Sequence, residues 1–402
     1  MSGAHRVVVQ TGQGLPELGW ADELAHLTDA WPYLGPTFLR GAEAMMPEIK
    51  PWHTVAGRGR GEIAVLPGYV LDSTPAVDHD PRTYLGWRPP SGEEVCCGVD
   101  LPCGQSAAVD ALGEGAFFPC LLLGSPLGYR TEVAYNFWTR SLFAQMVGAL
   151  VPAALEAGIH SIIAPWIPDR SGNADLVTAL VGQAGHETFW GYEDYVPLRA
   201  DSWEAHLAAL PIKMRQRITG DHRRAAASGV DIRRVDGEAI RPYIDRVAEL
   251  TCLNREKNGA GEQVGHITGV LRALLDAGAE VRAYLGVVDG TVVGSCVVLR
   301  KEHRLFPKWA GFDYQVLGER SGLYFALVLN APVCDAYQEG LRAVEFGAGA
   351  HQAKRLRGCS SRRVTTVLLV ADPALRATVT GFMDAFGRAR HVAFDQKGIP
   401  PR

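Results

Sequence analysis

The chain has 402 residues, of which 47% are apolar and 21% charged, a composition that excludes a disordered or coiled-coil protein. Forty basic and 44 acidic side chains give a formal net charge of −4, so an anionic partner must be bound by a local cluster of cations rather than by the whole surface. The length is typical of two or three domains.

No window reaches about 18 uninterrupted apolar residues, and the N-terminus lacks the basic-then-apolar order of a secretory signal. We therefore expect a soluble, cytoplasmic protein without a membrane partner. The eight cysteines include no CxxC pair and no spacing typical of tetrahedral zinc. Cys96, Cys97 and Cys103 form the only cluster, and we predict free thiols and no metal site.

The first 130 residues predict short elements separated by turns. A strand is expected over residues 6–10 and a helix over 20–27. Residues 50–130 are rich in Gly, Pro and Asp, and apolar runs at 63–71 and 117–123 within them predict strands. Loops of this kind commonly carry functional residues.

A helix-then-strand pattern occurs twice in the chain. The apolar spacing predicts a helix over 135–156 that ends at Gly158, followed directly by a strand over 159–163. A second helix over 323–338 ends at Gly340, and a strand over 341–346 follows. Each copy continues with a helix and a final strand, at 173–184 and 188–198 in the first and at 350–356 and 364–370 in the second.

This repeat predicts two similar halves, residues 1–200 and 201–402. Asp201 with Glu204 three positions later predicts a helix start with Asp201 as N-cap. Strands over 281–288 and 291–299 flank Asp289-Gly290, a strong hairpin signal, and residues 306–312 can add a third antiparallel strand. The predicted fold class is α/β (α+β), with a mixed, mostly antiparallel sheet flanked by helices in each half.

Two basic segments stand out, and both lie in the second half. The first contains Lys213 and Arg217 on a predicted helix that continues to Arg224; the alternative is a solvated helix face. The second contains Lys354 and Arg357, and no carboxylate occurs between positions 347 and 370.

The second segment follows Gly347, Ala348 and Gly349, where glycines let backbone amides approach an anionic ligand. This loop fits neither GxGxxG nor the phosphate loop that ends in GKS or GKT. An anion-binding site near residue 350 is therefore predicted from charge and backbone freedom together.

Several motifs resemble those of a known family. They are Gly-Leu-Tyr-Phe at 322–325, Glu-Gly-Leu-Arg-Ala-Val-Glu-Phe-Gly at 339–347, Lys354 with Gly358, and the lead-in segments at 203–207, 213–218 and 229–230. Together they resemble the C-terminal signature of FemAB-like proteins in the GCN5-related N-acyltransferase (GNAT) superfamily. The resemblance covers roughly residues 200–370 and reaches the first half only through the repeat.

The resemblance implies two tandem GNAT-like domains, the first on the acceptor side and the second binding the donor and catalytic. Members of this group form amide bonds, as in the Fem ligases that build peptidoglycan cross-bridges. Two departures from the family pattern bear on the substrates. Residues 315–322 only loosely match the pyrophosphate loop of acetyl-CoA enzymes, and the long helical hairpin of many Fem ligases is absent. A smaller amine acceptor, in a metabolite or peptide, is therefore expected.

Direct attack of an amine on an ester or thioester carbonyl requires stabilisation of an oxyanion but no nucleophilic side chain. Lys354 matches the family lysine near the reacting end of the donor. The amides of the loop at 347–349 can assist it. Glu345, His351 and Asp313 are candidate proton acceptors; the alternatives are an arginine ion pair for Glu345 and a helix cap for His351.

Further residues are assigned to binding. Arg357, Tyr324, Lys213 and Arg217 are predicted to bind the donor, with a core aromatic as the alternative for Tyr324. Glu193 and Asp194, on a predicted strand of the first half, are candidates for holding a cationic acceptor amine, and solvated carboxylates on an edge strand are the alternative.

The leading hypothesis is that no resident cofactor is used and that the donor is aminoacyl-tRNA, bound at its acceptor end. The second hypothesis replaces tRNA with acyl-CoA or an acyl carrier protein. The third is a catalytically silent peptidoglycan-recognition or scaffold module. The net charge of −4 argues against a large tRNA footprint, but contact with the acceptor end alone needs few phosphate contacts.

Overall fold

The computed structural model describes residues 7–13, 32–58, 62–73, 79–88, 104–127, 130–170, 172–257, 263–318, 321–396 and 398. The chain divides into two compact units. The first comprises Met1–Gly191 and Arg363–Lys397, and the second comprises Tyr192–Arg362 and Gly398–Arg402. The cysteine cluster at 96–103 and the helix predicted at 20–27 lie outside the described residues.

The first unit contains two groups of strands. The smaller sheet has the order β1-β3-β4-β7, formed by β1 (Val8–Gln13), β3 (His53–Gly57), β4 (Ile63–Leu66) and β7 (Ala134–Tyr135). The other group has the order β15-β8-β6-β5-β2, formed by β15 (Ser360–Val370), β8 (Ser161–Pro168), β6 (Cys120–Leu123), β5 (Gly68–Leu71) and β2 (Lys50–Pro51).

The single strand predicted over 63–71 is wrong. Pro67 separates β4 from β5, which belong to different sheets. A proline has no N–H to donate to a ladder, so the chain leaves one sheet there and enters the next.

The helices of the first unit cover these strands. They are η2 (Pro32–Leu34), α2 (Pro36–Met45), η4 (Pro81–Leu85), α3 (Gln105–Asp110), η5 (Glu114–Ala116), α4 (Leu142–Glu156), α5 (Asn173–Gly182) and α14 (Pro373–Gln396). Buried residues of α4, α5 and β8 share one apolar core. The helix predicted from residue 135 begins at Leu142 instead, after the short strand β7.

The second unit has strands in the order β10-β11-β12-β13-β14-β9. These are β10 (Asp231–Asp236), β11 (Val281–Val288), β12 (Thr291–Lys301), β13 (Arg304–Phe312), β14 (Ala343–Gly347) and β9 (His186–Pro197). Neighbours are antiparallel except β13 and β14. The predicted hairpin is confirmed, and Asp289 and Gly290 have the positive φ angles of 47° and 79° that a tight turn requires.

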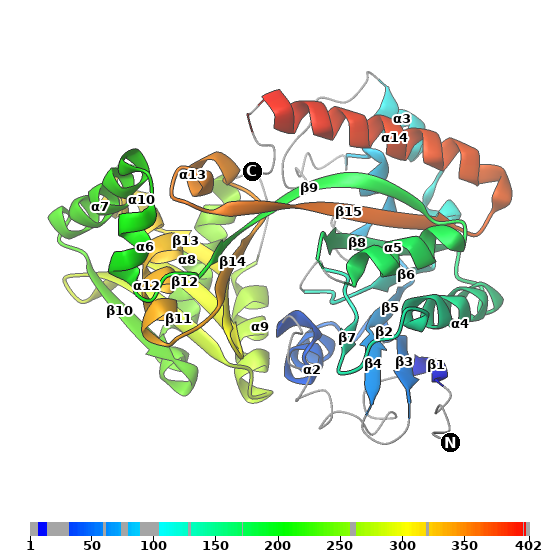
Figure 1. The fold of residues 1–402 in the computed structure, drawn as a ribbon, viewed down its shortest axis with the longest axis horizontal. Helices are drawn as coiled ribbons and strands as arrows, with labels where there is room; N and C mark the ends of the chain where they lie inside the picture. Colours follow the sequence, from blue (N-terminus) through cyan, green and yellow to red (C-terminus); the bar gives the residue numbers. More distant parts are fainter. Residues whose placement is uncertain are drawn as a thin grey trace. The chain divides into compact units, whose positions relative to one another are not determined.

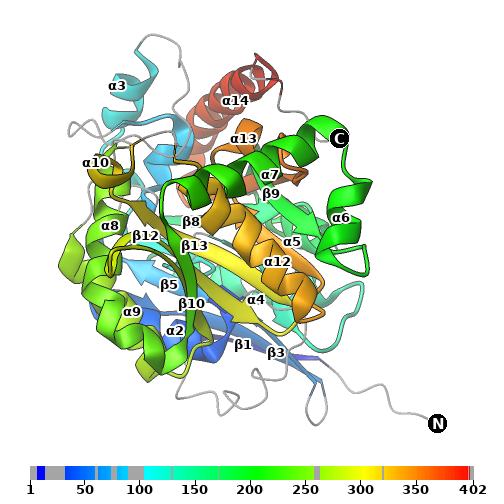
Figure 2. The ribbon, with the colours of Figure 1, turned by 90° about the vertical axis from the view of Figure 1, so that its left-hand side faces the viewer.

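The helices of this unit are α6 (Trp203–Ala209), α7 (Ile212–Ala227), η6 (Gly237–Tyr243), α8 (Ile244–Lys257), α9 (Val264–Asp276), α10 (Tyr314–Leu317), α11 (Leu323–Phe325), the π-helical η7 (Ala326–Asn330), α12 (Ala331–Gln338) and α13 (His351–Arg355). In Figure 2, α7 and α12 lie in front of the strands of this unit. The cap of α6 is Ser202, whose Oγ accepts from Ala205 N, and not Asp201 as predicted.

The two halves of the sequence exchange their final strands. The last strand of the first half, β9, pairs with β14 of the second half, and the last strand of the second half, β15, pairs with β8 of the first half. Residues 194–197 of β9 pair antiparallel with β14, and residues 364–370 of β15 pair antiparallel with β8 (Figure 1). The units therefore differ from the predicted division at residue 200, because 363–397 belong to the first unit. The helix α14 stays there because Phe386 and Phe394 pack on Trp190 and Phe189, with ring centroids 5.6 and 5.8 Å apart.

Within the described ranges, no helix is long and apolar enough to cross a membrane. Those residues also contain no group of three or more His, Cys, Asp or Glu side chains placed to hold a metal ion. Five described cysteines, at 120, 252, 296, 334 and 359, form no disulfide bond.

Candidate functional site

The centre of the candidate site is the segment 346–350, which comprises the last two residues of β14 and the turn into α13 and is called the loop here. Gly347 and Gly349 have positive φ angles of 64° and 80°, a backbone conformation that glycine adopts without strain. Lys354 of α13 reaches back into the loop and donates from Nζ to the carbonyl oxygens of residues 346–348, at 3.1, 3.0 and 3.1 Å. Its side chain is buried, with 3% exposure.

A fully buried carboxylate, Asp194 of β9, lies beside this loop. Its Oδ2 is 2.8 Å from His351 Nδ1 and 3.7 Å from Lys354 Nζ, and its Oδ1 accepts from Ser361 Oγ at 2.6 Å. His351 Nε2 accepts from Gly349 N at 3.3 Å, which assigns the ring proton to Nδ1. The histidine thus links Asp194 to the loop.

A second polar cluster surrounds Arg362. Its Nε lies 3.0 Å from Glu193, its Nη2 contacts Glu345, and its guanidinium lies 4.0 Å from the centroid of the Tyr195 ring. Arg304 lies 3.4 Å from the other oxygen of Glu345. Burial alone lowers the pKa of Arg362, but the charges of Glu345 and Glu193 outweigh it, so the pKa lies above its ordinary value and the arginine stays charged.

Arg357 is anchored to α7 rather than being free. Its guanidinium binds both oxygens of the buried Asp221, at 2.7 and 3.1 Å, and lies 3.2 Å from the centroid of the Phe325 ring. Arg224 lies 2.5 Å from the same carboxylate. These contacts place Arg357 between α7 and the start of the helix that begins at Leu323.

Tyr324, on that same helix, is packed among aromatic rings. Its centroid is 5.5 Å from Phe312 and 5.0 Å from Phe325. Burial, together with the nearby Cys296 and Tyr314, raises the pKa of Tyr324 to about 12, so it remains protonated.

The remaining predicted residues lie apart from the loop. Asp313 caps α10 by accepting from Val316 N at 3.3 Å, and it pairs with Arg246 at 3.0 Å. Lys213 and Arg217 are exposed on α7. The structure therefore brings Lys354, His351, Asp194 and the loop into one network and joins Glu345 to Glu193 in another, while Asp313 belongs to neither.

Glu193 and Asp194, predicted to hold the acceptor amine, are both engaged by other side chains. Both carboxylates are at most 1% exposed and are bonded within the second unit. Sequence reasoning missed Ser361, Arg362 and Asp221 as partners. The adjacent Ser361 and Arg362 on one strand, facing Asp194 and Glu193 on another, were the available signal, but it required knowing that β9 and β15 enter this region.

The parallel strands β13 and β14 pair at two positions only. Arg304 pairs with Ala343 and Leu305 with Val344. Beyond these, β13 continues to Phe312 and β14 to Gly347 without further mutual pairing among the described residues. The two strands therefore diverge as β14 approaches the loop.

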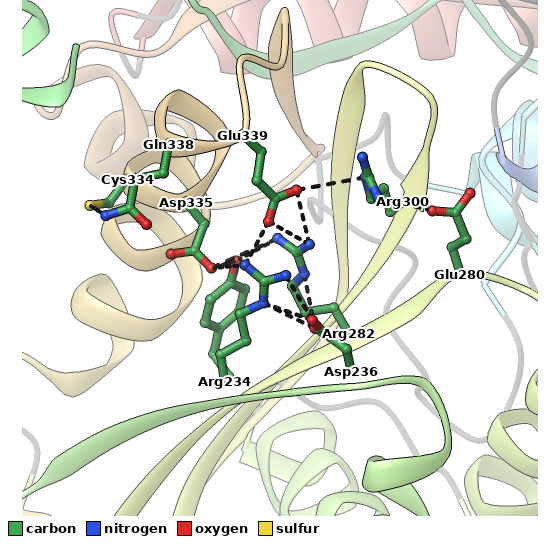
Figure 3. A network of polar contacts seen from close by, with 10 residues as sticks. Arg234, Asp236, Glu280, Arg282, Arg300, Cys334, Asp335, Gln338 and Glu339 are labelled. Carbon is green, nitrogen blue, oxygen red and sulfur yellow. Dashed lines mark hydrogen bonds and ion pairs between the residues drawn. The ribbon is translucent and has the colours of Figure 1, made fainter.

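A network of three arginines and four carboxylates holds α12 on the sheet (Figure 3). Arg282, 4% exposed at its side chain, contacts Asp236 at 3.1 Å and Glu339 at 2.8 Å, and Arg234 binds Asp236, Asp335 and Glu339. The side chains come from β10, β11, β12 and α12, together with Glu280 just before β11 and Glu339 just after α12. The network fixes the helix that leads from Tyr324 towards β14.

The chain matches one family of known proteins over most of its length. A profile of the FemAB-like family, described as peptidoglycan biosynthesis/recognition, matches residues 106–397. No curated protein matches the chain.

Among solved structures, FemX is 10% identical and aligns over 92% of this chain and all of FemX, with a TM-score of 0.55. A tandem GNAT protein from the clavulanic acid biosynthesis pathway is 13% identical over 92% of this chain and 99% of its own, with a TM-score of 0.47. The C-terminal domain of a putative lysylphosphatidylglycerol synthetase from Agrobacterium fabrum is 12% identical over 66% and 81%, with a TM-score of 0.45.

The FemX alignment spans both units and confirms the predicted tandem α/β fold. The family profile covers well over half of the chain and extends the resemblance beyond residues 200–370 in both directions. The chain therefore belongs to the FemAB-like family.

Proposed function

We propose that this protein forms an amide bond by moving an aminoacyl group from aminoacyl-tRNA directly to an amine of a small metabolite or peptide. Membership of the FemAB-like family and the FemX-like fold support acyl or aminoacyl transfer as the reaction class. The choice of a tRNA donor and of a small acceptor goes beyond this reaction class and is part of the proposal.

The observation that carries the choice of a polyanionic donor is the charge distribution on α7. Lys213 and Arg217 share one face, because positions four apart lie on the same side of a helix with 3.6 residues per turn. The only carboxylate of α7, Asp221, is buried and paired. The solvent-facing charges of this helix are therefore all positive, as contact with a phosphate backbone requires.

The loop at 346–350 supplies the chemistry in this proposal. The amine attacks the ester carbonyl, and backbone amides of the loop stabilise the resulting oxyanion. Collapse of the intermediate releases the terminal ribose hydroxyl, which takes the proton lost by the amine. His351, Glu345 and Asp313 each have hydrogen-bonding or ionic partners already, so proton transfer within the substrates is the simpler route.

The test offers the full chain a pool of charged tRNAs and, separately, a panel of acyl-CoA thioesters, each with a mixture of small amines and with mass detection of adducts. We expect amide products only with charged tRNA, and their loss after treatment with RNase. Products formed from acyl-CoA in the presence of RNase would refute the tRNA donor.

The alternative donor is acyl-CoA or an acyl carrier protein. The divergence of β13 from β14 after two pairs favours it, since the amides of an extended phosphopantetheine arm can pair with strand backbone. Thermal stabilisation by CoA, without any by tRNA, would select this alternative, because a ligand that binds only the native state raises stability.

A further inference from the structure

We propose that Lys354 acts as an internal cation that shapes the loop at 346–350, and that Asp194 is the residue that positions its ammonium. The donor-contacting group is then the backbone amide of Ala348, not the lysine. The inference rests on the proposed function, because it names the atoms that would receive the developing negative charge.

The hydrogen-bonding capacity of the Lys354 ammonium is used by the backbone of its own loop. A lysine ammonium has three N–H donors. Lys354 Nζ has three consecutive carbonyl oxygens, of residues 346–348, at 3.0 to 3.1 Å. These acceptors use all three donors, and the side chain is only 3% exposed. The ammonium is therefore engaged by its own chain and is not directed at a substrate.

The backbone N–H groups of residues 347–349 point away from Lys354. In a trans peptide, the N–H of a residue points opposite to the carbonyl of the residue before it. Because the carbonyls of 346–348 converge on Lys354, the N–H groups of 347–349 point away from it. The amide of Gly349 is taken by His351 Nε2. Across the described ranges, no backbone acceptor is found for Ala348 N, and Ala348 is half-buried.

The carboxylate of Asp194 holds the Lys354 ammonium in place. A buried charge is costly unless an opposite charge lies near it. Asp194 Oδ2 lies 3.7 Å from Lys354 Nζ, and the carboxylate is fixed by Ser361 Oγ and His351 Nδ1. Asp194 thus fixes the position of the Lys354 ammonium. The ammonium in turn fixes the orientation of the three carbonyl groups, and with them the outward direction of the Ala348 amide.

The proposal is tested by a double-mutant cycle on transfer rate. Ala348→Pro removes one N–H, and Lys354→Met removes the charge but keeps the length of the side chain. Gln352→Ala, at an exposed position of α13, is the control. We expect each of the first two to lower kcat about 10²- to 10³-fold, the typical loss for one oxyanion donor, with KM changed less than about threefold. The control should stay within about threefold of wild type.

The two losses should not multiply, because both remove the same stabilised amide. The double variant should therefore be within about fivefold of the slower single variant. Losses that multiply, or an Ala348→Pro variant with wild-type kcat, would overturn the proposal. If Lys354→Met does not fold, Asp194→Asn replaces it in the cycle, since it keeps the size of the side chain and removes the charge.

The cycle is run with whichever donor supports turnover, so acyl-CoA activity would refute the tRNA donor without touching this inference. If neither donor is used, the proposed function fails. The positioning role of Lys354 is then tested by amide hydrogen exchange of the peptide at 343–356. Exchange at least about tenfold faster in Lys354→Met, with unchanged exchange in β12, supports the positioning role. Unchanged exchange in the loop peptide overturns it.

Discussion

Arg357 and Asp221 form a bidentate ion pair although 136 positions separate them in the sequence, with Arg357 Nε 2.7 Å from Oδ2 and Nη2 3.1 Å from Oδ1. Asp221 is fully buried and also receives Arg224. The pair fastens α7 to the segment that follows α13. It also leaves the exposed face of α7 with positive charges alone.

Replacing Asp221 with Asn should destabilise the second unit. The change leaves Arg357, whose side chain is 9% exposed, without its counter-ion, and removing one partner of a buried pair typically costs about 3 to 5 kcal/mol. Urea denaturation should show a lower free energy of unfolding by about that amount. Arg223→Gln, an exposed position on the same helix, is the control and should change stability by less than about 0.5 kcal/mol. Equal effects of the two variants would contradict the structural role of the pair.

Neutralising Lys213 and Arg217 together should weaken tRNA binding and reduce its salt dependence. Each lost phosphate contact lowers the slope of log affinity against log salt by about 0.7 to 0.9, so the double Gln variant should lose roughly 1.5. Fluorescence anisotropy over a salt series measures this slope. Arg215→Gln, on the other side of α7 by helical periodicity, should leave the slope unchanged. A slope equal to that of wild type in the double variant would exclude these residues from the RNA contact.

Local signals in the sequence predicted the repeated elements well. Gly158 and Gly340 both have positive φ, 81° and 64°, and the next residue in each copy bonds back to the helix, from Ile159 N to Ala154 O and from Leu341 N to Ala336 O. The glycines that suggested the repeat therefore end two helices in the same way. Such caps are encoded within a few residues, which is why they can be read from one sequence.

Non-local pairing could not be predicted from such local signals. The exchange of β9 and β15 depends on which strands meet, and the polar residues at 193–194 and 361–362 can be matched only once that pairing is known. The orientation of Lys354 was missed for a related reason: residue type and spacing do not tell whether an ammonium faces a ligand or its own backbone. The helix α14 was missed although Asp372 caps it by accepting from Ala374 N at 2.8 Å.

The stability of the second unit should fall in acid through the network of Figure 3. Burial raises the pKa of Asp236, but hydrogen bonds and charges from Arg234 and Arg282 outweigh it, so the folded-state pKa lies below the ordinary value. Such a group contributes stability that is present above the unfolded-state pKa of about 3.9 and is lost as pH falls through the lower, folded-state value. When the free energy of unfolding is measured between about pH 2 and 5, it should depend less on pH in Asp236→Asn than in wild type.

The control for this pH series is Asp201→Asn, an exposed aspartate outside the network. Its curve should run parallel to that of wild type throughout the acid range. A wild-type curve as flat as that of Asp236→Asn would contradict the contribution assigned to Asp236.

Two glycine substitutions should have opposite effects on stability. A Cβ on Gly311 of β13 would lie 2.0 Å from the backbone carbon of Leu250 in α8, so Gly311→Ala must push the helix off the sheet. We expect a loss of at least about 3 kcal/mol, since overpacking against backbone cannot be relieved by a change of rotamer. At Gly381 in α14, no described atom lies within 4 Å of the position that a Cβ would take, so Gly381→Ala should instead add about 0.5 to 1 kcal/mol through helix propensity. Thermal unfolding of both variants measures the two effects, and a stable Gly311→Ala protein would show that α8 does not pack on β13 as closely as the structure requires.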